Sequence, residues 1–337
     1  AITKPAGPGH WRDSWHSLGI ADGLPDPTIT DIAQDSAGAL WFATFGGGVA
    51  RHTGQEITVY QQGLGSNKIT AVLQGRDGAM WFGAEADPAE GKGLSSLIDG
   101  VITTYSAADG LPSGYVRKIA EDINGDLWLA TPVGLCRFDG QRFTLFTTAD
   151  GLVNNDVFHL SINSQGGVWA ATRGGLSYYD GYHFANYTTA DGLQNLSIES
   201  IVLDGDDRPW VGTHNGTAHF DGGGFTPHTQ ESGLLQGAVY DLIVDREGCV
   251  WAATSAGISH YDGVKWVNYT TADGLAHPIV GTLYEDQSGD LWFGTGYALR
   301  GTHAGVGVSQ FTRGEFRSWP TRVGIMSVAL DHSGLVW

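Results

Sequence analysis

The residues best suited to chemistry in this sequence are three histidines and two carboxylates, namely His214, His277, His303, Glu85 and Asp87. Imidazole and carboxylate groups act as general acids and bases, or as metal ligands, when a fold brings them together. The sequence contains no HExxH motif and no GxSxG motif, so no fixed spacing ties these residues to one reaction. Catalysis therefore stays one hypothesis, which depends on where the fold places these side chains.

The two cysteines, Cys136 and Cys249, indicate packing rather than chemistry. No CxxC pair and no Cys/His spacing typical of a zinc site is present. A disulfide would require the fold to bring the two residues together, so we expect two buried thiols. We predict no metal site and no cofactor. Ca²⁺ bound by the Asp-containing turns is the alternative, but each turn offers few oxygen ligands.

The charge balance excludes some partners. The chain contains 18 Lys and Arg residues and 36 Asp and Glu residues, which gives a net charge of −18. Such a surface repels nucleic-acid phosphates and anionic lipid headgroups. No apolar run approaches the ~18 residues of a membrane-spanning helix, so we predict no membrane segment in this chain.

A tryptophan motif repeats along the chain. It has the form of "LWFAT" or "VWAAT", and the successive tryptophans are about 41 residues apart. Because a large ring recurring with one period indicates packing between repeated sheets, we predict a structural role for seven of them. They are Trp41, Trp81, Trp128, Trp169, Trp210, Trp251 and Trp292.

One period contains four strand-sized pieces, at residues 198–204, 209–213, 217–222 and 224–229, with turn residues between them. A helical repeat is disfavoured, because the 51 glycines of the chain would destabilise helices. The predicted fold is therefore an all-β β-propeller made of four-stranded antiparallel blades.

Two stretches carry a family resemblance, "GLCRFDGQRFTLFTTADGL" (134–152) and "GISHYDGVKWVNYTTADGL" (257–275). They resemble the two-component regulator propeller repeat, and the resemblance covers about residues 15–337. It implies an extracellular or periplasmic bacterial sensor domain that binds a small molecule or an oligosaccharide. It also implies further domains in a longer parent protein.

Seven blades are favoured over eight. We predict an N-terminal extension at residues 1–14, seven repeat units at 15–312, and the start of an eighth unit, or extra strands, at 313–337. Residues 15–24, "WHSLGIADGL", align with "WVNYTTADGL" at 266–275. We therefore expect the N-terminal strand to close the ring by pairing residues 15–20 with a strand near 307–312.

Two insertions, at residues 85–93 and 296–307, interrupt the period and indicate a binding face, because long loops are common binding sites. We predict an oligosaccharide ligand there. The alternatives are a lyase-type or lactonase-type enzyme that uses His and Glu on the same face, and a protein-interaction scaffold. The candidate ligand-binding residues are Tyr115, Asn155, Arg173, His214, Tyr240, His277, Tyr297, Lys68 and Glu85.

Overall fold

The computed structural model of the 337-residue chain describes residues 2–5, 10–12, 15–17, 23–26, 29–53, 55–87, 91–275, 277–285, 289, 291–295, 306–312 and 315–321. These residues form short β-strands joined by turns and by single-turn 3-10 helices. They divide into two compact units, the first reaching Thr147 and the second beginning at Thr148. Across these ranges, no helix has the length and apolar character needed to cross a membrane.

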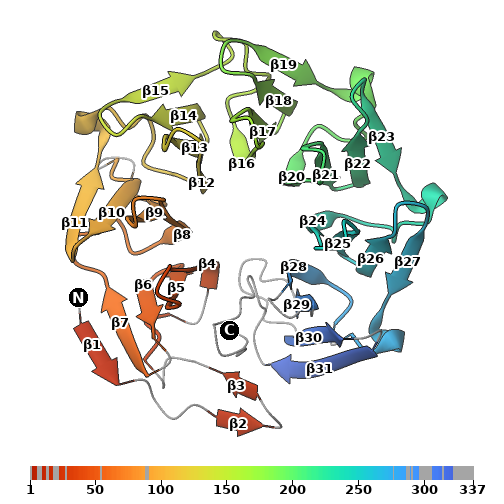
Figure 1. Ribbon diagram of the computed structural model, residues 1–337, viewed down its shortest axis with the longest axis horizontal. Helices are drawn as coiled ribbons and strands as arrows, with labels where there is room; N and C mark the ends of the chain where they lie inside the picture. The colour runs from red at the N-terminus through yellow and green to blue at the C-terminus, as the bar shows by residue number, and fades with distance from the viewer. Residues whose placement is uncertain are drawn as a thin grey trace. The chain divides into compact units, whose positions relative to one another are not determined.

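The first unit contains three antiparallel sheets of four or five strands in which consecutive strands are neighbours, and a separate two-stranded sheet near its N-terminus. The first strands of the three sheets, β4, β8 and β12, pack next to one another in turn (Figure 1). The first sheet is β4 (Ile29–Gln34), β5 (Leu40–Thr44), β6 (Gly48–His52) and β7 (Glu56–Tyr60), with β1 (Ile2–Pro5) added beside β7; the second is β8 (Ile69–Gln74), β9 (Met80–Ala84), β10 (Leu94–Ile98) and β11 (Val101–Tyr105); the third is β12 (Lys118–Glu121), β13 (Leu127–Thr131), β14 (Gly134–Phe138) and β15 (Phe143–Phe146).

The second unit repeats this pattern four times, and its first strands β16, β20, β24 and β28 again pack next to one another. The sheets are β16 (Val157–Ile162), β17 (Val168–Thr172), β18 (Gly175–Tyr179) and β19 (Phe184–Tyr187); β20 (Ile198–Leu203), β21 (Pro209–Thr213), β22 (Gly216–Phe220) and β23 (Phe225–His228); β24 (Val239–Val244), β25 (Val250–Thr254), β26 (Gly257–Tyr261) and β27 (Trp266–Tyr269); and β28 (Val280–Glu285), β29 (Leu291–Thr295), β30 (Val306–Thr312) and β31 (Glu315–Thr321). The four strands predicted within residues 198–229 agree with β20 to β23 to within two residues.

The two ends of the chain pair differently from the predicted closure. Residues Trp15–Ser17 (β3) form a hairpin with His10–Arg12 (β2). Both edges of β30 are already occupied, by β29 and β31. A strand accepts only one neighbour on each edge, so the pairing that we expected between residues 15–20 and 307–312 does not occur among the described strands. The predicted boundary at residue 312 falls between β30 and β31, which belong to one sheet, and the predicted extension 1–14 contains β1 and β2.

Five of the repeated tryptophans lie at the contact with the next sheet. Trp41 packs against Val72, Met80 and Phe82 of the second sheet, and Trp210 against Val239 and other residues of the sixth. Six of the seven tryptophans are at most 8% exposed, which is what a ring between two sheets requires; the side chain of Trp292 lies outside the described residues. Their structural role stays a prediction, tested by substitution below.

The turn between the first and second strands carries an Asp that ties the turn to its tryptophan. Asp35 Oδ1 accepts hydrogen bonds from the backbone N–H groups of Ala37 and Ala39, and Oδ2 accepts one from Trp41 Nε1 at 2.9 Å. Asp122 and Asp245 make the same three bonds in their own sheets. These turn carboxylates, which were the alternative Ca²⁺ ligands, are therefore used mainly to hold the turn.

The repeated "TTADGL" forms the link between sheets. Thr188 caps the 3-10 helix η3 (Thr189–Asp191), Asp191 bonds back to the Thr188 backbone, and Gly192 ends the helix with a φ of 100°. A Cβ on Gly192 would lie 2.0 Å from the carbonyl oxygen of Phe225, so only glycine fits. Leu193, which follows, is 2% exposed and packs in the next sheet. Equivalent caps begin η2 (Ala107–Asp109), η4 (Gln230–Ser232) and η5 (Thr271–Asp273).

Candidate functional site

The candidate site residues lie at one end of each sheet, which we call the loop end. Here the loop between the second and third strands meets the link that enters the first strand. In the fourth sheet, the backbone N–H of Arg173 in the loop bonds to the carbonyl oxygen of Asp156 in the link. In the second sheet, Glu85 N bonds to Lys68 O in the same way. The predicted site residues Lys68, Glu85, Asn155, Arg173 and His214 all belong to these loops and links.

A β-bulge interrupts the first strand near the loop end in most sheets. The register of the first strand shifts by one residue against the second, which leaves one residue unpaired. Bulges commonly re-aim a side chain beside a binding site. The bulge residues of the fourth, fifth and sixth sheets are Phe158, Glu199 and the predicted site residue Tyr240.

In the second unit, bulge and loop residues form contacting pairs. The guanidinium carbon of Arg173 lies 5.2 Å from the ring centre of Phe158, and Arg173 Nε lies 3.2 Å from Asp156 Oδ2. In the next sheet, His214 Nδ1 lies 3.5 Å from Glu199 Oε1. The Arg173 and His214 side chains remain 66% and 54% exposed, so both present a polar group to solvent beside a fixed partner.

In the first unit, five residues form a continuous set that we call the first-unit cluster: Phe45, Lys68, Glu85, Tyr115 and Arg117. Lys68 Nζ lies 5.5 Å from the ring centre of Phe45 and 3.5 Å from Glu85 Oε1. The backbones of Glu85 and Tyr115 form an isolated β-bridge, and the Arg117 guanidinium lies 5.1 Å from the ring centre of Tyr115. The cluster thus places aromatic, basic and acidic groups side by side.

The insertion at 85–93 holds this cluster in place. Its described residues contact the link before the third sheet, because Ala86 N bonds to Gly114 O at 2.8 Å. Glycine permits the approach: a Cβ on Gly93 would lie 2.6 Å from the carbonyl carbon of Gly114. The insertion is therefore packed against its neighbours at both ends. The second predicted insertion, at 296–307, lies almost entirely outside the described residues.

Other predicted residues have local roles or were not placed. Asn155 Oδ1 accepts a hydrogen bond from Thr148 N, which fixes the link, and His277 Nδ1 accepts one from Ile279 N. Tyr240 is half-buried at its bulge. Tyr297 and His303 lie outside the described residues, so the convergence of three histidines predicted for an enzyme stays untested.

Sequence reasoning missed several residues that contact the predicted ones, namely Phe45, Asp156, Phe158 and Glu199. Three of them occupy two positions of the repeat, and only one of these positions can be recognised in the sequence. Phe45 follows the threonine that ends "LWFAT", as Arg173 and His214 follow theirs. Phe158 and Glu199 occupy the bulge position, which the sequence does not reveal because an unpaired residue looks like any other strand residue.

The histidines whose pKa values are shifted lie on third and fourth strands rather than at the loop end. Burial, and then the charge of His219, lowers the pKa of His228 to about 4. His228 packs against Trp210, with ring centres 4.9 Å apart, and its Nδ1 accepts a hydrogen bond from Trp266 Nε1. Its shifted pKa therefore reflects packing in the core.

Comparison with known families decides the identity of the repeat. The sequence model described as "Two component regulator propeller" matches residues 23–46, 63–86, 110–132 and 274–297. Four segments of the chain are two-component regulator propeller repeats. Each matched segment runs from a link "GL" through the first two strands to the loop end of a two-component regulator propeller repeat. Among curated proteins, none matches the chain significantly.

Solved structures confirm the β-propeller fold of this two-component regulator propeller. The extracellular domain of BT3049 from B. thetaiotaomicron, assigned to a hybrid two component system, has a TM-score of 0.64 at 19% identity, over 96% of this chain and 45% of that one. The extracellular domain of BT4673, assigned to a one component system of the same organism, has a TM-score of 0.63 at 18% identity, over 92% of this chain and 49% of that one. The chain thus spans about half the length of these two proteins. The structure of virginiamycin B lyase from Staphylococcus aureus has a TM-score of 0.62 at 15% identity, over 79% of this chain and 91% of that one.

Proposed function

We propose that this chain is an extracellular ligand-binding domain of a sensor protein, and that it binds a neutral oligosaccharide at the loop end of its sheets. The first-unit cluster carries the proposal. Sugars are bound by aromatic rings that contact their C–H groups and by charged or amide groups that bond their hydroxyls. Phe45 is 46% exposed, and Lys68, Glu85 and Arg117 stand beside the two aromatic rings of the cluster.

The similar structures support the sensor part of the proposal. Two of them are extracellular domains of bacterial signalling systems, each about twice as long as this chain. A domain of this length has the size to be the ligand-binding part of such a protein. The net charge of −18 favours a neutral ligand over a polyanionic one, because the whole surface repels anions.

A glycan array followed by calorimetry tests the proposal. The Phe45→Ala and Lys68→Met substitutions should each weaken binding of the selected glycan by about 10-fold or more, which corresponds to about 1.4 kcal/mol. Tyr182→Ala is the matched control, because Tyr182 is 85% exposed on the turn between β18 and β19, at the opposite end of its sheet. A glycan whose affinity falls with Tyr182→Ala but not with Phe45→Ala would exclude the loop end.

A second candidate function is general acid–base catalysis, and one contact favours it. Glu199 Oε1 accepts a hydrogen bond from Ser197 Oγ at 3.2 Å and faces His214 Nδ1 at 3.5 Å. A carboxylate that orients an imidazole leaves the other ring nitrogen available to a substrate. Turnover of a lactone panel that disappears in His214→Asn, with glycan binding unchanged, would favour this function over binding alone. Absence of turnover in the parent protein would exclude it for that panel.

A further inference from the structure

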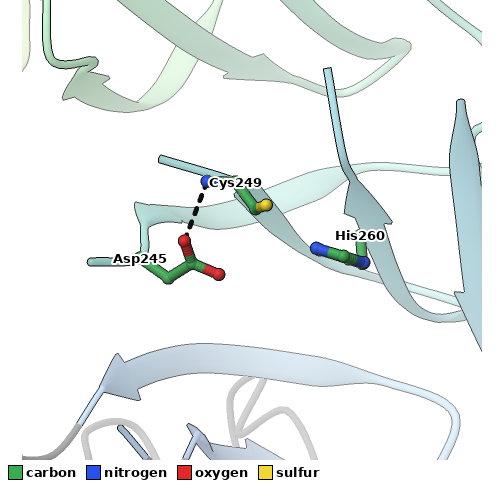
Figure 2. A group of neighbouring side chains, drawn as sticks. All are labelled: Asp245, Cys249 and His260. Carbon is green, nitrogen blue, oxygen red and sulfur yellow. Dashed lines mark hydrogen bonds between the residues drawn. The ribbon is translucent and has the colours of Figure 1, made fainter. Parts of the chain in front are cut away.

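Three side chains of different chemistry meet at the turn end of the sixth sheet, opposite the loop end. Asp245 and Cys249 lie in the turn between β24 and β25, and His260 lies on β26 (Figure 2). One possible ligand atom from each residue lies within 4.8 Å of the other two. All three residues are half-buried, so a solute can reach them. Carboxylate, thiolate and imidazole are together a typical donor set for Zn²⁺.

In two other sheets the same position is occupied by a direct acid–base pair. In the first sheet, Arg51 donates a hydrogen bond to Asp35 Oδ2 at 3.0 Å. In the fifth sheet, His219 Nε2 lies 3.0 Å from Asp204 Oδ2. Like Arg51 and His219, His260 stands directly opposite the repeated tryptophan. In these two sheets, a cationic or hydrogen-bonding group on the third strand therefore pairs with the carboxylate of the turn.

The sixth sheet lacks such a pair in the described part of the chain. The His260 ring stacks on Trp251, with ring centres 4.2 Å apart, and no hydrogen bond joins it to the turn carboxylate. Asp245 accepts two backbone bonds on Oδ1 but only the Trp251 bond on Oδ2. A carboxylate oxygen accepts two bonds, so Oδ2 retains capacity for a cation.

The charges around the three residues favour a cation. The carboxylates of Asp245, Glu247 and Asp262 act electrostatically on both Cys249 and His260. A bound dication would offset the carboxylates and stabilise the thiolate.

We propose that Asp245, Cys249 and His260 form a binding site for a divalent transition metal of the Zn²⁺ class, with its fourth position open to water. Tetrahedral zinc with the usual bond lengths separates its ligand atoms by roughly 3.5 Å, so the side chains need to converge by about 1 Å. Their exposure allows that rotation. The backbone N–H groups of Glu247 and Cys249 donate hydrogen bonds to Asp245 Oδ1, and these bonds hold the carboxylate in place.

Metal titration of the whole chain tests the site. Tag-free protein is stripped with a chelator, kept reduced with a phosphine, and titrated with Zn²⁺ by calorimetry and with Co²⁺ by absorption spectroscopy. We expect one strong equivalent per chain, a thiolate-to-cobalt charge-transfer band, and a higher melting temperature with Zn²⁺. A spectrum without the charge-transfer band would overturn the assignment of Cys249 as a ligand.

Two substitutions copy the first sheet, so both should fold. Cys249→Ala introduces the residue type that occupies the equivalent position of the first sheet, Ala39. His260→Arg likewise introduces the residue type of Arg51. Loss of a residue that only holds a metal ligand in place lowers metal affinity by roughly 10–100-fold. Loss of a ligand itself, as in each of these variants, should lower Zn²⁺ affinity by at least as much. Cys136→Ala, the control, removes the other thiol and should leave affinity unchanged. Equal Zn²⁺ affinity in the parent and both variants, with matching circular dichroism, would place the metal elsewhere and overturn the proposal.

Discussion

A single atom at residue 163 decides whether the tryptophan of the fourth sheet is hydrogen-bonded. Asn163 replaces the turn Asp of the first, third, fifth and sixth sheets, and its Oδ1 still accepts bonds from Gln165 N and Gly167 N. Its Nδ2, however, is a donor and bonds to Tyr178 Oη. Trp169 Nε1 is consequently buried without an acceptor.

Asn163→Asp should therefore stabilise the protein by about 1 kcal/mol, because it supplies an acceptor to Trp169 Nε1 and can accept from the Tyr178 hydroxyl. Chemical denaturation monitored by tryptophan fluorescence measures the change. Asp35→Asn is the reverse experiment and should cost about 1–3 kcal/mol, since Trp41 loses its acceptor and Arg51 its partner. A melting temperature lowered by Asn163→Asp would contradict this account.

A second residue-scale effect is acid sensitivity at His228. The pKa of His228 is lowered to about 4 in the folded state, mainly by burial, against 6.5 in the unfolded chain. A depressed folded pKa means that the unfolded state takes up the proton first. The stability present above pH 6.5 is therefore lost as the pH falls from about 6.5 to about 4.

His228→Asn should flatten the pH dependence of stability in that window by about 1–2 kcal/mol, after allowance for partial exposure to solvent. The Asn oxygen can take the place of Nδ1 as acceptor for Trp266 Nε1. Denaturation curves between pH 7 and pH 4 provide the measurement, and His183→Asn, at an exposed turn, is the control. Equal pH profiles for parent and His228→Asn would show that another group titrates.

At the scale of elements, the links between sheets are stabilised by capping boxes. Thr188 Oγ1 accepts a hydrogen bond from Ala190 N, and Asp191 Oδ2 accepts one from Thr188 N at 2.8 Å. The two bonds fix the direction in which the chain enters the next sheet. They explain why the letters "TTADGL" recur.

Thr188→Ala should cost about 1 kcal/mol, the usual value of a lost N-cap. Thr189→Ala changes the same residue type one position later, where the side chain is exposed, and should have almost no effect. Urea denaturation of the two variants compares them directly. Equal losses from both would show that the first threonine does not act as the cap.

Contacts between successive sheets form the second element-scale feature. Trp210 is 4% exposed and stacks on His219, with ring centres 4.5 Å apart, while it packs on Val239 and Leu242 of the next sheet. Trp210→Ala should destabilise the protein by about 3–5 kcal/mol through the cavity it leaves. Calorimetric melting tests this, with Tyr182→Ala as the exposed aromatic control. A parent-like melt would make the repeated tryptophan dispensable for the fold.

At the scale of the whole molecule, the net charge of −18 is the main global property. Repulsion among 36 carboxylates opposes the compact state and is screened by salt. Moderate sodium chloride should raise the melting temperature by roughly 2–4 °C, equivalent to about 1 kcal/mol. Sucrose at equal osmolality controls for solvent effects. A melting temperature that falls with salt would show that local ion pairs such as Arg246–Glu285 outweigh the repulsion.

The sequence by itself determined the features that depend on near neighbours. Strand lengths, the Asp turns, the "ADGL" links and the repeat of about 41 residues all follow from local hydrogen bonding and glycine conformation, and they lead to the β-propeller fold. The contacts of Glu85 with Lys68 and of His214 with Glu199 needed the structure, because strand pairing brings together residues at least 15 positions apart. The approach of His260 to Asp245 and Cys249 also needed the structure, and no spacing rule indicated it. The pairing of β1 with β7 was also decided by tertiary structure, because an edge strand can add to any open edge and local sequence does not choose which.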